Sequence, residues 1–141
     1  AQKTVTVTKG WSEAYSMFLK GESDLVLSYT TSPAYHIIAE GDSKYAAASF
    51  EEGHYTQVEV AAKVKGSKNE KLADEFMVFI LSDEFQSAMP TGNWMYPVTD
   101  IELPKGFEQL TVPQKALGFT PEEIASKRKP WIREWQSALT F

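Results

Sequence analysis

The sequence contains no cysteine, and this absence excludes a disulfide bond, a thiolate zinc site and a thiol nucleophile. Basic residues are also few, because 14 Lys and Arg stand against 19 Asp and Glu and give a formal net charge of −5. Nucleic acids and anionic membrane surfaces attract clustered Lys and Arg, so neither is an expected partner. No apolar run in the sequence approaches the roughly 18 residues of a membrane-spanning helix.

Sequence motifs of several enzyme classes are missing as well. The chain has no GxSxG, GxxxxGK[ST], GxGxxG or HExxH pattern. Of its two histidines, His36 lies among apolar neighbours and is interpreted as a structural side chain. His54 follows Glu51 and Glu52, and these three residues are the only local candidates for acid–base chemistry or metal binding. Binding is therefore favoured over catalysis.

What remains is an ordinary globular composition, with 43% hydrophobic and 23% charged residues in a chain of 141. This length suits one domain or a large piece of a bigger one. The sequence begins Ala1-Gln2-Lys3 without an initiator methionine, and we expect it to be a fragment of a longer protein.

Hydrophobic periodicity predicts alternating strands and helices. Strands are expected at 4–8, 24–28 and 54–64, and helices at 12–20, 33–40, 70–80, 83–89 and from 121 onward. This order is typical of an α/β sheet. The apolar stripes of the helices, including Trp131 and Trp135 near the C-terminus, are expected to face inward.

Local signals predict where these helices begin and end. The expected starts are Ser12, Ser32-Pro33, Asn69 and the capping box Thr120–Glu123, and the expected stops are Gly21, Gly41 and Pro90. Pro130 is expected to break or kink the last helix.

Aromatic residues gather in three predicted loops, at 9–12, 28–35 and 90–97. Their members are Trp11, Tyr29, Tyr35, Trp94 and Tyr96. Small polar residues accompany them and are candidates for fixing polar groups of a ligand: Ser12, Thr30, Thr31, Ser32 and Asn93. Aromatic faces attract flat cations, and the helix start at Ser32-Pro33 offers free N–H groups to an anion. We interpret the three loops as converging on one ligand.

Residues 4–15, 21–36 and 90–97 (PTGNWMYP) closely resemble the periplasmic thiamine-binding proteins of bacterial thiamine ABC importers. The resemblance runs nearly from end to end of this chain and covers somewhat under half of the family's mature protein. It implies an α/β fold that is part of a two-lobed type II periplasmic binding protein, with the N-terminal portion missing.

The resemblance also implies site residues. Trp11, Tyr35 and Trp94 match ligand-contacting aromatic residues of the family, and Tyr29 and Ser32 match the same crossover. Asn93 joins this ligand-binding set. No catalytic residue, metal or cofactor is implied, and the ligand would be thiamine, thiamine monophosphate or thiamine diphosphate.

The type II fold further implies a division into lobes. Residues 1–45 and 120–141 are expected in one lobe and 54–89 in the other, with crossovers at 46–53 and 90–98 and surface coil at 99–119. The expected partner is the membrane permease of an ABC importer, and the expected location is the periplasm. Exposed strand edges further predict that the fragment by itself either binds thiamine weakly or not at all, or oligomerises to cover these edges.

Two alternatives stay open from the residues alone. One is a binding protein of the same fold for another small cation, such as a polyamine or ferric ion. The other is an enzyme that acts on a small heteroaromatic molecule, with His54 and Glu51 or Glu52 as its only local candidates.

Overall fold

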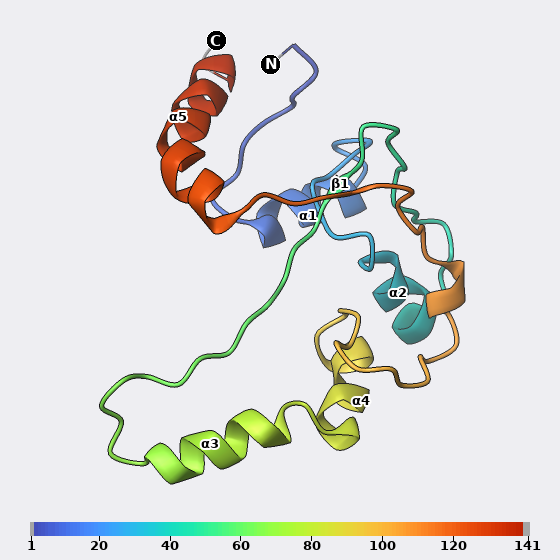
Figure 1. Cartoon of the computed structure of the whole chain (residues 1–141). Helices are drawn as coiled ribbons and strands as arrows, with labels where there is room; N and C mark the ends of the chain where they lie inside the picture. Colours follow the sequence, from blue (N-terminus) through green and yellow to red (C-terminus); the bar gives the residue numbers. More distant parts are fainter. Residues whose placement is uncertain (1, 140–141) are drawn as a thin grey trace. The chain divides into compact units, whose positions relative to one another are not determined.

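The computed structural model describes residues 2–139, and Figure 1 shows its elements. In chain order these are α1 (Trp11–Leu19), α2 (Pro33–Tyr35), the π-helix η1 (His36–Glu40), β1 (His54–Tyr55), α3 (Glu70–Phe79), α4 (Asp83–Gly92), the 3₁₀ helix η2 (Phe107–Gln109), β2 (Ala116–Leu117) and α5 (Pro121–Leu139). β1 and β2 form a two-stranded sheet. None of the helices in the described part is long and apolar enough to cross a membrane.

The chain divides into two compact units. One consists of Ala1–Ser28 with Leu117–Phe141, and the other of Tyr29–Ala116. The lobe boundaries given by the sequence resemblance remain predictions.

The expected long strands are wrong for this chain. Residues 4–8 and 24–28 have no strand pairing within the described part, and the strand expected at 54–64 is reduced to β1. Figure 1 draws the chain between β1 and α3 as a bare tube. Alternating β-branched residues favour extended backbone, but a strand also needs a neighbour with which to exchange hydrogen bonds. Without one, the apolar side chains stay exposed, to 91% at Leu27 and 86% at Val60.

Local signals for helix ends are largely confirmed. Ser32 and Pro33 occupy the N-cap and first position of α2, and η1 ends at Gly41, which has a left-handed backbone. Asn69 precedes α3 as its N-cap.

The capping box of α5 is also confirmed. The Thr120 N–H donates to Glu123 Oε2 at 3.0 Å, and the Glu123 N–H donates to Thr120 Oγ1 at 3.2 Å. The hydrogen bond from the Thr120 backbone holds the pKa of the Glu123 carboxyl below its ordinary value.

Two helix boundaries differ from the prediction. α1 begins at Trp11 with Gly10 as its N-cap, rather than after Ser12. α4 includes Pro90, although the sequence predicts that this proline stops the helix. α5 includes Pro130, where the sequence predicts a break or a kink, and continues to Leu139. A proline removes one helical hydrogen bond, and packing can offset that loss. Pro90 is fully buried, which is consistent with such an offset.

The described core lies in the unit Tyr29–Ala116. Ala34, Phe107 and Leu110 are buried together, and Ile37, Ile38 and Trp94 pack against them. Two of these core residues, Phe107 and Leu110, come from 99–119, so this stretch contributes to the core as well as to the predicted surface coil. Its prolines and glycine interrupt regular structure without keeping the intervening apolar side chains out of the core.

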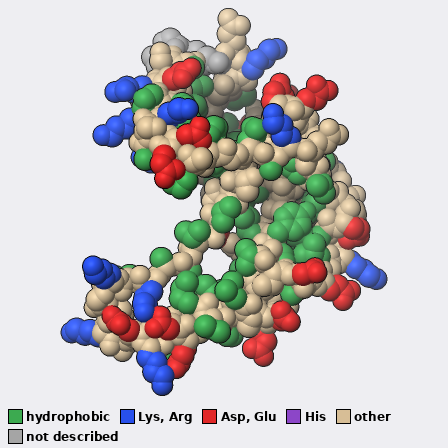
Figure 2. Space-filling model, viewed as in Figure 1, with side chains coloured by type: hydrophobic (Ala, Val, Ile, Leu, Met, Phe, Trp, Pro, Cys, Tyr) green, Lys and Arg blue, Asp and Glu red, His purple; other side chains and the backbone are tan. Residues whose placement is uncertain are grey.

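Several helix faces expected to be buried are exposed instead. On α3, Leu72, Phe76 and Phe79 are exposed, and on α5 the Trp135 side chain is 56% exposed. Trp131 is half-buried against the Phe119 ring, with the ring centres 4.9 Å apart. Figure 2 shows apolar side chains open to solvent on the face in view.

Gly106 lies where the core approaches η1. Its φ is +110°, and a Cβ there would lie 3.0 Å from Ile37 Cγ2 and 3.0 Å from Ile38 Cγ1. We expect Gly106→Ala to destabilise the full-length protein containing this chain by about 2–4 kcal/mol, from backbone strain and overpacking together. Urea unfolding measures this. Gly66→Ala is the matched control, because Gly66 also has a positive φ of +80° but a Cβ added to it would have nothing within 4 Å. Equal losses in the two variants would contradict the packing argument.

Candidate functional site

Tyr35 and Trp94 form an aromatic pair. Their ring centres are 5.3 Å apart with the planes at 85°, an edge-to-face contact. Tyr35 ends α2, whose start is set by Ser32 and Pro33, and Trp94 follows the C-cap of α4. Tyr35 is exposed and Trp94 half-buried. Two of the aromatic residues expected to meet therefore do so, although they come from distant parts of the sequence.

Trp94 has an unusual backbone for a tryptophan. Its φ is +54°, and among non-glycine residues in the described part it alone has a positive φ. This left-handed conformation costs about 1–2 kcal/mol for a residue with a Cβ. Glycine or asparagine usually occupies such a position after a helix. The Asn93 N–H donates to Met89 O at 3.0 Å, and the Trp94 ring packs against the core, so the surroundings hold the ring in place. Strain of this kind is concentrated at functional sites.

His36 is buried and packs against Tyr35, one member of the aromatic pair. The side chain is 1% exposed, its Nδ1 lies 2.6 Å from Glu40 Oε2, and its ring contacts those of Tyr35 and Tyr45. The expectation of a buried structural histidine is confirmed. His36–Glu40 is a π-helix, a geometry that is frequent at functional sites.

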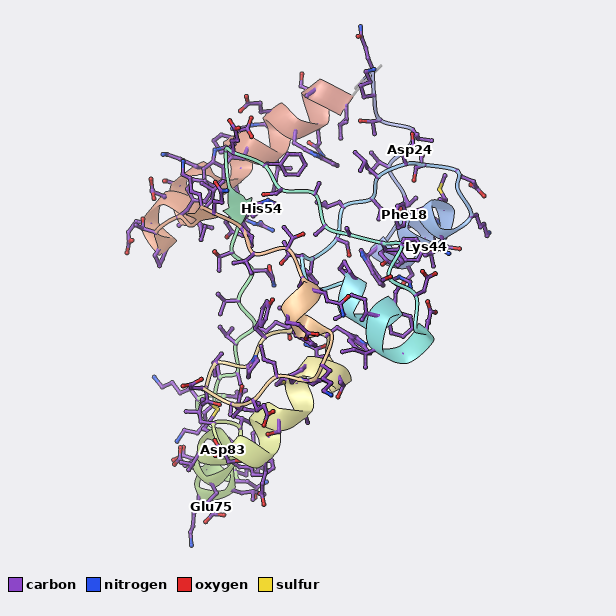
Figure 3. The ribbon with its side chains drawn as sticks, turned by 90° about the vertical axis from the view of Figure 1, so that its right-hand side faces the viewer. Phe18, Asp24, Lys44, His54, Glu75 and Asp83 are labelled. Carbon is purple, nitrogen blue, oxygen red and sulfur yellow. The ribbon has the colours of Figure 1, made fainter. Side chains whose placement is uncertain are left out.

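Lys44 lies just after this π-helix (Figure 3). Its Nζ is 4.8 Å from the centre of the Tyr45 ring and 2.9 Å from Asp42 Oδ2. The hydrogen bond from Lys44 holds the pKa of the Asp42 carboxyl below its ordinary value of 3.8. The Tyr45 ring thus contacts both an imidazole and an ammonium group.

Tyr29 and Ser32 close a turn before α2. The Tyr29 N–H donates to Ser32 Oγ at 3.2 Å, and the Ser32 N–H donates back to Tyr29 O at 3.0 Å. The Ala34 and Tyr35 N–H groups bond to Thr31 O and Ser32 O. The free N–H groups expected at this helix start are therefore engaged within the turn, so that expectation is wrong.

Thr31 in the same turn carries a buried hydroxyl. Its side chain is 4% exposed, and its Oγ1 has no hydrogen-bond partner among the residues that the structure describes.

Asn93 connects the Trp94 loop to a distant segment. Its Nδ2 donates to Glu59 Oε2 at 3.2 Å, across 34 positions of sequence. Sequence reasoning selects Asn93 but misses Glu59, because nothing in the local pattern around Glu59 sets it apart from other surface carboxylates.

Trp11 belongs to the other unit, Ala1–Ser28 with Leu117–Phe141. It opens α1, whereas the sequence predicts a loop at this position. Its Nε1–H donates to Ser28 Oγ at 3.0 Å, and its ring centre is 4.6 Å from that of Tyr15. The indole remains 56% exposed.

Tyr96 packs against the core rather than beside Trp94. Its ring meets the Phe107 ring edge-on at 5.6 Å. Partial burial raises the pKa of the Tyr96 phenol above its ordinary value of 10.0.

The alternative of an enzyme depends on His54, which lies in β1 (Figure 3). Its Nε2 accepts a hydrogen bond from the Phe50 N–H at 3.1 Å. Within residues 2–139, no group of three or more His, Cys, Asp or Glu side chains is arranged to hold a metal ion. His54 therefore stabilises the local turn in this structure.

Comparison with known proteins gives this geometry its context. The family described as "Bacterial extracellular solute-binding protein" matches residues 2–87. The "Thiamine-binding periplasmic protein" of Escherichia coli (strain K12) is 64% identical over 140 residues, which are 99% of this chain and 43% of that protein. The protein of the same name from Haemophilus influenzae is 49% identical over 138 residues, 97% of this chain and 41% of that protein.

A solved structure named "Periplasmic thiamin binding protein" matches with a TM-score of 0.93 at 64% identity. The match covers 99% of this chain and 44% of that one. The chain thus spans less than half the length of the relatives it matches. The expected fold class, α/β and part of a type II periplasmic binding protein, is confirmed by these matches.

Proposed function

Because this chain belongs to the bacterial extracellular solute-binding protein family, we propose that it is part of the substrate-binding component of an importer for thiamine and its phosphates. The observation that carries the proposal is the Tyr35–Trp94 pair, held at 5.3 Å by the ends of α2 and α4. The names and high identity of the relatives support the same ligand.

The proposed mechanism rests on cation–π attraction. Thiamine has a flat, positively charged thiazolium ring, and an aromatic face gains about 0.5–2 kcal/mol from such a cation. Trp11, Tyr29, Ser32 and Asn93, which the family resemblance selects, would add further contacts to the ligand. The two lobes would close on the ligand, and binding would shift the population toward the closed state.

The protein would act without a catalytic residue, a cofactor or a metal. It would work in the periplasm and deliver its ligand to the membrane permease of an ABC transporter. The ligand would leave chemically unchanged, which separates this proposal from the alternative of an enzyme.

A thiamine titration of the full-length protein tests the proposal. We expect tryptophan fluorescence to change with a dissociation constant of micromolar or below, because the ligand would stack on indole rings. Chromatography should recover thiamine intact, and the polyamine spermidine should not compete. No binding up to millimolar thiamine, or formation of a product, would contradict the proposal.

A further inference from the structure

The two segments that form the aromatic pair carry no carboxylate of their own. Neither residues 29–39 nor residues 90–99 contain an Asp or Glu. Glu40 follows the first segment, but its Oε2 already lies 2.6 Å from His36 Nδ1. Within the described chain, a carboxylate that adds a counter-charge to a cation at Tyr35 and Trp94 would therefore come from another segment.

Glu59 is the carboxylate that hydrogen bonding brings to this loop. Its Oε2 accepts from Asn93 Nδ2 at 3.2 Å, and Asn93 immediately precedes Trp94. The Glu59 side chain is otherwise exposed, so it retains acceptor capacity beyond that one bond.

The segment that carries Glu59 is fixed on both sides. At one end the His54 N–H donates to Lys115 O at 3.0 Å, next to the pairing of β1 with β2. At the other end Lys63 Nζ lies 2.7 Å from Asp74 Oδ1 on α3. Because Lys63 already has Asp74 as its counter-charge, Glu59 does not serve that role, and its hydrogen bond is with Asn93 instead.

We propose that Glu59 is a specificity-determining residue, whose carboxylate supplies the counter-charge for a cationic ligand ring at the Tyr35–Trp94 pair. This inference rests on the proposed function and extends it to charge selection. Aromatic faces bind flat rings whether these are neutral or positively charged, although they favour cations. A nearby carboxylate adds a preference for positive charge that shape alone does not give.

The test compares Glu59→Gln with the unmodified full-length protein. Glutamine keeps an oxygen that can accept from Asn93 and removes only the charge. We expect thiamine affinity to fall about two- to fivefold at low salt, as for an exposed charge pair. The loss should shrink toward zero in 1 M salt, where the screening length is about 3 Å.

An uncharged ligand of the same shape distinguishes the effect of the Glu59 charge from the effect of Glu59 on the position of Asn93. In the deaza analogue of thiamine, a neutral thiophene replaces the thiazolium ring. We expect Glu59→Gln to leave its affinity within about twofold of that of the unmodified protein, because no charge pair is lost. Glu102→Gln is the matched control, since it removes the same charge from an exposed residue and should change neither affinity.

Each outcome decides the inference. Equal losses for thiamine and for the neutral analogue would show that Glu59 only positions Asn93, and would overturn it. Unchanged thiamine affinity in Glu59→Gln would overturn it while leaving the proposed function intact. Absence of thiamine binding by the unmodified protein would overturn both.

Discussion

Replacing Trp94 by alanine in the full-length protein is expected to weaken thiamine binding at least tenfold. The substitution removes a ring that would contribute about 0.5–2 kcal/mol of cation–π attraction. It also removes apolar contact area, and a loss of about 1.4 kcal/mol is already tenfold. Tyr35 would in addition lose the ring that it meets edge-on at 5.3 Å. Isothermal titration calorimetry measures the change, and an unchanged dissociation constant would contradict the assignment of Trp94.

A second substitution at this position distinguishes the effect of losing the ring from the effect of backbone strain. Trp94→Gly also removes the ring, but glycine adopts the observed φ of +54° without steric cost. We expect Trp94→Gly to be about 1 kcal/mol more stable than Trp94→Ala in urea unfolding, with the same loss of affinity. If alanine were the more stable of the two, the left-handed backbone would not be a source of strain.

The 141-residue chain by itself is expected to bind thiamine at least a hundredfold more weakly than the full-length protein. Its described core is small, with Ala34, Phe107 and Leu110 buried together. Extended segments such as 4–8 and 24–28 keep exposed apolar side chains and have no strand partner in the described part. A small core leaves little free energy to hold a binding site in one arrangement.

Tryptophan fluorescence during a thiamine titration measures this, with the full-length protein as the control. Light scattering on the same sample measures the oligomeric state, because unpaired extended segments are expected to associate with other chains. A monomeric chain with micromolar affinity or tighter would contradict the prediction. An oligomer with weak binding is the expected result.

What can be predicted from the sequence depends on how local the determining interactions are. The starts of α2 and α5 are predicted correctly because Pro33 and the Thr120–Glu123 capping box act within one turn. The pairing of Tyr35 with Trp94 is anticipated from a resemblance to known proteins and from the clustering of aromatic residues near element ends. Periodicity by itself gives no reason for these two rings to meet.

The wrong predictions concern features that depend on contacts between distant residues. The β-branched alternation predicts strands at 4–8 and 24–28, but a strand is defined by its neighbour, which a local pattern does not contain. Pro90 is predicted to end α4, yet it is fully buried in the last turn. Glu59 is missed because its bond to Asn93 spans 34 positions. In each case the deciding contact lies outside the window in which the pattern is read.

The backbone of Trp94 bears on which molecules the protein would accept. A side chain whose main chain is locked by a helix terminus on one side and by core packing on the other has little freedom to swing aside. Such an indole would present a rigid, flat surface, with which a planar aromatic ligand makes more contact than a puckered or branched one. Selection for planar ligands would then depend on the backbone conformation of Trp94. Lengthening α4 by a single residue would remove this selectivity, because each added helical residue rotates the next part of the chain by about 100°.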